Sequence, residues 1–312
     1  MATQLVRFDW AIKHLLRHKT NFGVLEGFLS VLLDEDVKIK QILSSQSNQE
    51  TGDDKYNDVD ILVENSKGEL IIVEVQNTKE HDYFHRILFG TSKVLSEYIS
   101  EGQIYAAVKK VISITIAYFD LGQGEDYVYH GTNTFKGIHK GDLLMLSDKQ
   151  RELYQKQHVH EIYPEYWIIK AGIFNKDEVH DELDEWIYFF KTGEVKNGFT
   201  AAGLAEAKKK LNKLKLTAQQ RKEYNEFVER MRKIASYEAT AEEDAKDLIK
   251  ENERKQKEAL LEAVSEARLE EKTQTVLELH KMGMSLENIV LVTKLDIGQI
   301  QQIIDKYQKE RD

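Results

Sequence analysis

The clearest alternation of hydrophobic and polar residues in the chain is that of a β-hairpin. Two aliphatic and β-branched runs, residues 59–63 and 70–75, flank a short polar segment that contains Gly68. Glycine can adopt the positive φ of a tight turn, so this segment predicts the turn of the hairpin. Side chains alternate between the two faces of a strand, which places Glu74 and Gln76 on the same face of the second strand.

Apolar residues spaced by three and four predict helices, and shorter apolar runs predict further strands. The two kinds of element alternate, which indicates an α/β fold with a mixed central sheet flanked by helices. A single proline in 312 residues also favours a high helix content. The polar residues 44–57 predict a flexible approach to the hairpin. The predicted helices span residues 9–17, 23–33 and 79–100, and the further strands residues 111–118, 126–130 and 166–169.

Composition narrows the classes of protein that fit. Apolar residues make up 41% of the chain, enough for a real core, and no cysteine offers a disulfide or a thiolate metal ligand. No apolar run approaches the length of a membrane span, so we expect a cytoplasmic protein with no membrane partner. The net charge of −10 would repel a polyanion as a whole, so contact with a nucleic acid would need local positive patches or a bound metal.

Two carboxylates of the hairpin form a candidate metal site. Asp60 and Glu74 lie on neighbouring strands among Ile and Val side chains, where an uncompensated charge is costly. A divalent cation shared by both carboxylates would offset that cost, and the carbonyl of Val75 would supply a third oxygen ligand. The alternative is a hairpin whose acidic residues are solvated at its ends.

Several separated motifs follow one another along the first 192 residues. They are Asp9-Trp10-Ala11-Ile12-Lys13, Glu26-Gly27-Phe28-Leu29, Asp60-Ile61-Leu62-Val63, Glu74-Val75-Gln76, Phe84-His85-Arg86-Ile87 and Asp184-Glu185-Trp186-Ile187-Tyr188-Phe189-Phe190-Lys191. Their order resembles that of the PD-(D/E)XK nuclease superfamily, and more closely its recombination-promoting nuclease branch, whose members are also described as transposases. The resemblance implies a restriction-endonuclease-like core and metal-dependent hydrolysis of DNA phosphodiester bonds. It further implies Mg²⁺ or Mn²⁺ as the cofactor and no organic cofactor.

The resemblance also implies roles for single residues. Asp60 and Glu74 would hold the metal, and Glu26 would be a third ligand or hold a water, unless it is a rim residue paired with a nearby Lys or Arg. Gln76 occupies the place of the superfamily's catalytic lysine; its amide can orient water but supplies no charge.

Two basic residues of the following helix are candidates to meet the phosphate. Lys79 could supply the charge that Gln76 lacks. Arg86 could pair with a phosphate through both arms of its guanidinium, or form a surface salt bridge instead.

The charge pattern changes beyond residue 192. Residues 201–234 hold ten Lys or Arg, among them Lys208, Lys209 and Lys210, against four Glu, whereas residues 235–271 hold twelve acidic residues against six basic ones. The two segments could pair as antiparallel helices, or the basic one could bind the DNA backbone. We predict a nuclease-like domain at residues 1–192, a charged helical region for an arm or dimerisation at 193–272, and a small tail at 273–312.

The tail has the pattern of three short helices. Ser285 is the expected N-cap of the second, and Asp296 and Gln299 have the spacing of a capping box that opens the third. The arrangement is similar to the helix-turn-helix tails of transposases and resolvases. That similarity implies major-groove contacts by Gln299 and Gln302; docking of another protein is the alternative.

Two classes of function stay open at this point. The first is an active metal-dependent DNA endonuclease associated with recombination, mobile elements or defence. The second is a catalytically weak protein of nuclease fold that binds DNA or a partner as an accessory or regulatory factor. Cleavage of both strands by a subunit with one site would favour a two-fold homodimer, so the expected partners are DNA and a second copy of the chain.

Overall fold

The computed structural model describes residues 5–43, 60–98 and 104–309. The chain divides into two compact units, Met1–Val228 and Glu229–Asp312. The first contains a β-sheet, whereas the described residues of the second are helical apart from two short connections. The predicted flexible approach at residues 44–57 lies outside the described residues.

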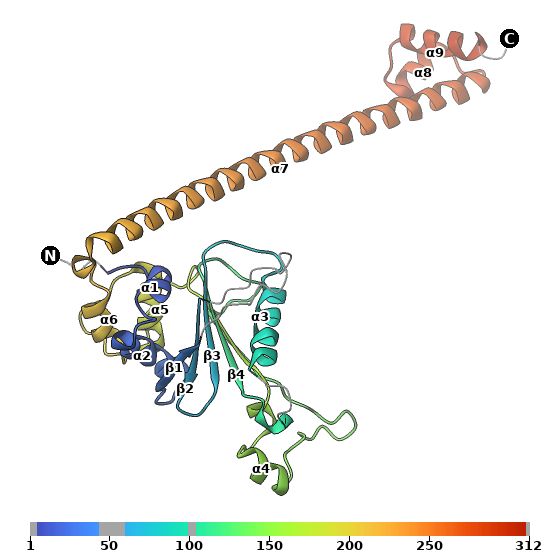
Figure 1. Cartoon of the computed structure of the whole chain (residues 1–312). Helices are drawn as coiled ribbons and strands as arrows, with labels where there is room; N and C mark the ends of the chain where they lie inside the picture. The colour runs from blue at the N-terminus through green and yellow to red at the C-terminus, as the bar shows by residue number, and fades with distance from the viewer. Residues whose placement is uncertain (1–4, 44–59, 99–103, 310–312) are drawn as a thin grey trace, which may run out of the picture. The chain divides into compact units, whose positions relative to one another are not determined.

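A mixed sheet forms the centre of the first unit (Figure 1). Among the described residues it has six strands in the order β1-β2-β3-β4-β6-β5. β1, β2 and β3 are antiparallel neighbours, β3, β4 and β6 run parallel, and β5 pairs antiparallel with β6. The predicted hairpin is confirmed, with Gly68 at a φ of 78° in its turn. The strands span Ile39–Leu43 (β1), Ile61–Asn65 (β2), Leu70–Gln76 (β3), Val111–Ala117 (β4), Val128–Gly131 (β5) and Glu165–Lys170 (β6).

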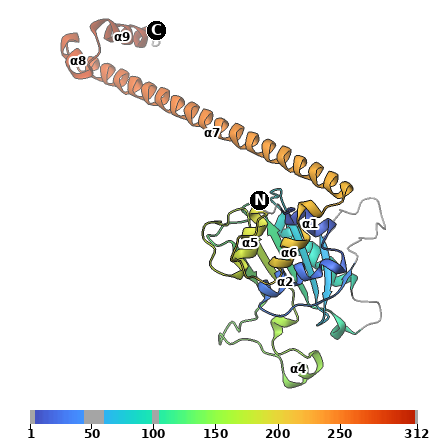
Figure 2. The same ribbon diagram turned by 90° about the vertical axis from the view of Figure 1, so that its left-hand side faces the viewer.

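Helices cover both faces of this sheet. α1, α2, α5 and α6 lie over one face and α3 over the other (Figures 1 and 2). This arrangement confirms the predicted α/β class, and only β1 among the strands was not anticipated from the sequence. The helices of the sheet-containing unit are Phe8–His14 (α1), Phe22–Leu33 (α2), Tyr83–Glu97 (α3), Asp148–Tyr154 (α4), Glu182–Thr192 (α5) and Leu204–Lys210 (α6), with 3-10 turns at Lys19–Asn21 (η1), Tyr105–Ala107 (η2), Val159–Glu161 (η3) and Lys213–Lys215 (η4).

Hydrophobic cores fill the space on both sides of the sheet. Beneath α1, α2 and α5, the fully buried Phe8 and Trp186 lie with ring centroids 6.4 Å apart in an edge-on contact. On the other face, Ile72 packs in a smaller cluster with Val94 of α3. Glu74 shares the strand face of Ile72, as the alternation predicted, and the structure shows that this face lies against α3.

One long helix, α7 (Ala218–Lys281), leads into the second unit. The sequence left open an antiparallel pairing of the segments 201–234 and 235–271, but from Ala218 onward both belong to α7, which continues through residue 234 without a turn. Charges within the helix pair locally instead, as between Glu251 and Arg254 at 2.8 Å, which stabilises an exposed helix. No helix among the described residues is both long and apolar enough to cross a membrane.

The end of α7 packs with α8 (Leu286–Thr293) and α9 (Ile297–Lys309) around an apolar core of its own. The predicted capping box is confirmed: the backbone N–H of Asp296 donates to Gln299 Oε1 at 3.1 Å, and that of Gln299 to Asp296 Oδ1 at 2.8 Å. Ser285 stands at the N-cap of α8 as expected, but its side chain makes no capping hydrogen bond. The core consists of Val276, Ile289, Leu295, Ile300 and Ile304.

Candidate active site

The carboxyl ends of the parallel strands meet at one edge of the sheet, where α/β proteins usually bind their ligands. Gln76 at the end of β3 pairs with Ala117 of β4. Ile61 pairs with Val73, so Asp60, directly before β2, lies opposite Glu74. The fold thus brings the two acidic residues together at this edge, each only 7% exposed.

Asp60 is held from three sides. Its Oδ2 accepts a hydrogen bond from the backbone N–H of Val75 at 2.7 Å, and its Oδ1 lies 2.8 Å from Lys13 Nζ. Arg17 Nη2 donates to the Asp60 carbonyl at 2.6 Å, which ties the segment after α1 to the start of β2. Burial raises the pKa of the Asp60 carboxyl above its ordinary value, although the Lys13 ammonium and the Val75 N–H act in the opposite direction.

The Val75 carbonyl has the orientation that a third oxygen ligand needs. The N–H and C=O of one strand residue point to the same side, and the N–H of Val75 points to Asp60. The next carbonyl, that of Gln76, points the other way and accepts from Tyr118 at 2.9 Å. The Val75 carbonyl therefore faces the same side of β3 as the Asp60 carboxylate, next to the start of β2.

Glu74 lies against Arg86 of α3. Arg86 Nη2 lies 2.9 Å from Glu74 Oε1, an ion-pair distance, and Arg86 Nη1 lies 3.0 Å from Glu80 Oε1. Burial, and then the charge of Asp60, raise the pKa of the Glu74 carboxyl, while Arg86 lowers it. Burial would lower the pKa of Arg86, but Glu74 and Glu80 outweigh it and the net shift is upward.

Unsatisfied polar atoms gather around this pair. Within the described part of the chain, the buried side-chain atoms without a hydrogen bond are Glu74 Oε1, Tyr83 Oη and Arg86 Nε. Tyr83 is fully buried in the first turn of α3, and burial followed by the charge of Glu74 raises the pKa of its hydroxyl. Buried polar atoms without partners are costly and rare in folded proteins. Glu74 Oε1 is ion-paired with Arg86, but none of the three atoms has a hydrogen bond, so a ligand or water could bind here.

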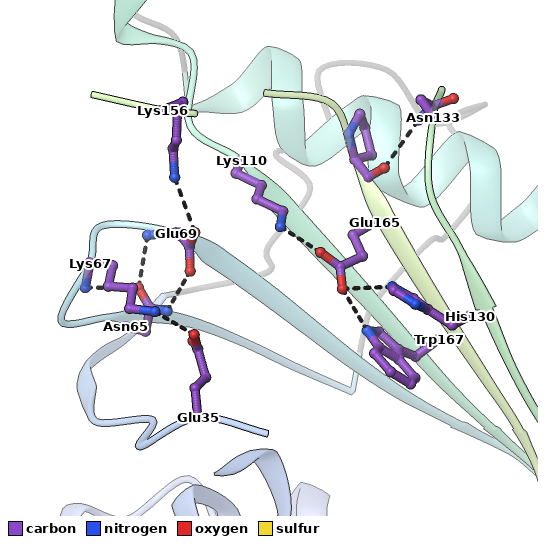
Figure 3. Close-up of polar contacts among 11 residues, drawn as sticks. Glu35, Asn65, Lys67, Glu69, Lys110, His130, Asn133, Lys156, Glu165 and Trp167 are labelled. Atoms are coloured by element: carbon purple, nitrogen blue, oxygen red, sulfur yellow. Dashed lines mark hydrogen bonds and ion pairs between the residues drawn. The ribbon is translucent and has the colours of Figure 1, made fainter. Parts of the chain in front are cut away.

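Two acids at the opposite edge of the sheet, the partly buried Glu165 and the buried Glu69, each have several polar partners (Figure 3). Glu165 pairs with Lys110 and accepts from Trp167 Nε1 at 2.9 Å, and its Oε1 lies 2.8 Å from His130 Nε2. Glu69 accepts from Asn65 Nδ2 at 2.9 Å and lies near Lys156. Surface cavities of about 450 and 610 Å³ open at this edge. Their size alone does not make them the reactive site, because among the described residues the unsatisfied groups lie at the other edge.

The donor set at the carboxyl edge fits a hard divalent cation. No group of three or more His, Cys, Asp or Glu side chains suited to a metal occurs among the described residues. Mg²⁺, however, is commonly bound through one or two carboxylates and keeps several waters. Asp60, Glu74 and the Val75 carbonyl satisfy that requirement, and the unsatisfied Oε1 of Glu74 is an oxygen that such an ion would engage.

Glu26 does not join the other predicted site residues. Its Oε1 accepts from the backbone N–H of Ile39 at 2.8 Å. Ile39 pairs with Asn65, at the end of β2 away from Asp60. The structure therefore places Glu26 as a partner of the β1 backbone and not beside the acidic pair.

Gln76 and Lys79 lie beside the site without touching its carboxylates. Gln76 Nε2 donates to Glu80 Oε1 at 2.8 Å and to the Thr78 carbonyl at 3.1 Å. Lys79 lies in the loop before α3 and not on the helix as predicted, because α3 begins only at Tyr83. No ion pair in the described chain joins Lys79 to the two acids.

The N-terminal motif reaches the site in a way that the sequence analysis missed. Lys13 contacts Asp60, while Asp9 is bound by Arg7, whose Nη2 also donates to Asn77 Oδ1 at 3.0 Å. The spacing of Asp9 and Lys13 places both on one side of α1. That spacing was the available signal, but it did not reveal which strand the helix would face.

The other residues that the sequence predicted to contact DNA do not lie beside Asp60 and Glu74. In α6, Lys210 Nζ donates to the Thr20 carbonyl at 3.0 Å, Lys208 is partly exposed and Lys209 is exposed. In the second unit, Gln299 is engaged in the capping box and Gln302 is exposed on α9.

The site and the fold agree with one protein family. The model of the PD-(D/E)XK nuclease family transposases matches residues 6–252 and so includes both acids, Lys13 and Arg86. Neither a curated protein nor a solved structure matches the chain. The match covers most of the chain, and a mixed sheet flanked by helices is consistent with a PD-(D/E)XK-like fold. The chain therefore belongs to the PD-(D/E)XK nuclease family transposases, which supports a nuclease- or transposase-related function.

Proposed function

We propose that this protein is a divalent-metal-dependent DNA endonuclease that hydrolyses phosphodiester bonds in recombination, mobile-element movement or defence. One observation carries the proposal: two buried carboxylates meet at the carboxyl edge of the sheet, next to the unsatisfied atoms of Glu74, Tyr83 and Arg86. Lys13 and Arg86 each lie against one of the two acids, but the acids still repel each other, and a divalent cation between them would relieve that repulsion. Family membership supports DNA as the substrate.

Asp60, Glu74 and the Val75 carbonyl would hold Mg²⁺ or Mn²⁺, which when bound supplies the charge that polarises a phosphoryl group and lowers the pKa of water. The Val75 N–H fixes the orientation of the Asp60 carboxylate. Arg86 lies against Glu74 and Glu80 and would donate to a phosphate oxygen. Hydrolysis consumes one water: its oxygen bonds to phosphorus, the bond to the leaving oxygen breaks, and that oxygen takes up a proton.

Further contacts with DNA belong to the same proposal. Lys208 and Lys209 lie in the last turn of α6, and their side chains are at least partly exposed, so they could bind backbone phosphates. On α9, Gln302 is exposed and free of the capping box that engages Gln299. A two-fold homodimer would allow both strands to be cut. The cytoplasmic location expected from the sequence stays a prediction.

The test is cleavage of supercoiled plasmid with Mg²⁺, Mn²⁺, Ca²⁺ or EDTA. We expect wild type to cut with Mg²⁺ or Mn²⁺, and Asp60→Asn and Glu74→Gln to lose about 10³-fold or more in rate, since several kcal/mol of transition-state stabilisation is lost. Glu69→Gln is the matched control, because Glu69 is a buried acid at the other end of β3. Equal loss in Glu69→Gln would show a general effect on folding, and unimpaired cutting by Glu74→Gln would contradict the proposal.

A catalytically weak DNA-binding or regulatory protein is the alternative function. The observation that favours it is Gln76, whose uncharged amide is turned to Glu80 and Thr78. In that case wild type would bind DNA without cutting it under any metal, and Asp60→Asn would leave the affinity for DNA unchanged.

A further inference from the structure

The proposed reaction requires a positive charge that the end of β3 does not provide. The family's name specifies a lysine two residues after the acid of β3, and here that position is Gln76. Negative charge builds up on the phosphoryl oxygens as water attacks, and donors fixed next to those oxygens stabilise it. Gln76 has no charge, and its amide N–H groups already donate to Glu80 and Thr78.

The structure brings one lysine to the acidic pair from a different element. Lys13 Nζ, in the last turn of α1, lies 2.8 Å from Asp60 Oδ1. The Lys13 side chain is 51% exposed, whereas that of Asp60 is 7% exposed, so the ammonium stands between the buried carboxylate and solvent. An ammonium has three N–H donors, and the contact with Asp60 uses one of them.

The place of Lys13 is built into the fold. Neighbours of Lys13 on α1, such as Trp10 and Ile12, are buried in the main core, so the helix cannot swing away from the sheet. Arg17 anchors the following turn by its hydrogen bond to the Asp60 carbonyl at 2.6 Å. The backbone of Lys13 is therefore fixed beside Asp60, and its half-exposed side chain has room to turn the ammonium toward a ligand.

Other cations near the site are less suited to this role. Arg86 is shared between Glu74 and Glu80. Lys79 lies in the loop before α3, and no described ion pair joins it to Asp60 or Glu74. We infer that Lys13 is the catalytic lysine of this chain, which neutralises Asp60 in the free protein and donates to the scissile phosphate or the attacking water in the complex. This inference rests on the proposed endonuclease function.

A charge-relocation experiment tests the inference in the full-length protein. We expect Lys13→Met to lower the rate of plasmid cleavage by about 10²- to 10³-fold, as the loss of one transition-state donor does. The double variant Lys13→Met/Gln76→Lys should cleave plasmid about tenfold or more faster than Lys13→Met alone, because the new lysine returns an ammonium to the same site. Lys19→Met is the matched control, since Lys19 is exposed just beyond α1, and it should cut like wild type.

A second measurement follows the site without catalysis. Thermal unfolding is recorded with EDTA and with Ca²⁺ for wild type, Lys13→Met and Asp60→Asn. Lys13 and the cation both compensate the charge of Asp60, so Ca²⁺ should raise the Tm of Lys13→Met more than that of wild type. In Asp60→Asn the stabilisation by Ca²⁺ should be largely lost.

The outcomes separate this inference from the proposed function. If wild type cuts and Lys13→Met cuts as fast, or if Lys79→Met is the variant that loses activity, Lys13 is not the catalytic lysine although the endonuclease function stands. If Lys13→Met no longer responds to Ca²⁺, or Gln76→Lys fails to rescue it, Lys13 has only a structural role. If wild type cuts nothing with any metal, the proposed function and this inference fall together.

Discussion

A close contact between helices α2 and α6 offers a quantitative test of the fold. A Cβ added at Gly27 would lie 2.4 Å from Gly203 Cα and 2.5 Å from both Gly203 N and Ala202 O, all of them backbone atoms. The opposing backbone cannot easily retreat, because Trp186 Nε1 donates to Ala202 O at 3.0 Å and Gly203 adopts a φ of 83°. Gly27→Ala must therefore push the start of α6 away from the core.

The magnitude follows from three contributions. Overpacking costs about 3 kcal/mol at a site that cannot relax. Weakening the Trp186 hydrogen bond adds about 1 kcal/mol. Alanine regains about 1 kcal/mol over glycine as a helix former. We expect Gly27→Ala to be destabilised by about 3 kcal/mol, which lowers Tm by about 6–12 °C for a unit of this size.

Tryptophan fluorescence during heating and urea unfolding is the suitable assay. The three tryptophans are Trp10, Trp167 and Trp186, and all lie in the first unit, so the signal reports that unit alone. Gly131→Ala is the control, because its Cβ would meet Tyr166 only at an ordinary 3.6 Å. A Tm of Gly27→Ala as close to wild type as that of the control would refute the packing of α6 on α2.

Two further predictions concern charged residues of the first unit. Hydrogen bonds from Lys40 and Gln41 hold the pKa of Glu64 at about 2, below the ordinary 4.5, so its contribution to stability is complete above pH 4.5 and is lost as pH falls toward 2. Glu64→Gln should therefore lower the free energy of unfolding by about 1 kcal/mol at pH 7. Urea unfolding should show this difference from wild type shrinking below pH 4.5. A difference that stays constant with pH would contradict the low pKa of Glu64. Lys170 is fully buried and donates to Asp120 and to a loop carbonyl, so Lys170→Met should cost about 2 kcal/mol. Asp120→Asn should cost less than half as much stability as Lys170→Met, because Asp120 is 58% exposed. Thermal unfolding measures both losses, and equal losses would contradict this prediction.

Local patterns account for the features that the sequence predicted correctly. The hairpin, the strands after it and the capping box at Asp296 all depend on residues close together in the chain, such as Gly68 in its turn. The two-residue period of a strand placed Glu74 and Gln76 on one face, and the structure showed that α3 covers it. The resemblance to the family added which residues would form the site, which periodicity alone does not supply.

Contacts between distant segments decided the rest. The resemblance assigned Glu26 to the site, but the packing of α2 against β1 directed its carboxylate to Ile39 at the other end of the hairpin. Likewise, nothing in the local sequence showed that the charge pattern around residue 234 lies within one uninterrupted helix.

The sequence by itself determined which groups are available for chemistry: two strand carboxylates, a glutamine in place of a lysine, and a lysine in an N-terminal motif. Only the tertiary structure decided which of them meet. Asp60 and Lys13 are far apart in the chain, and their contact exists because α1 packs on the sheet with its last turn beside the start of β2. Such a contact depends on the direction in which one element crosses another, and that direction is set by the whole core and by no single segment.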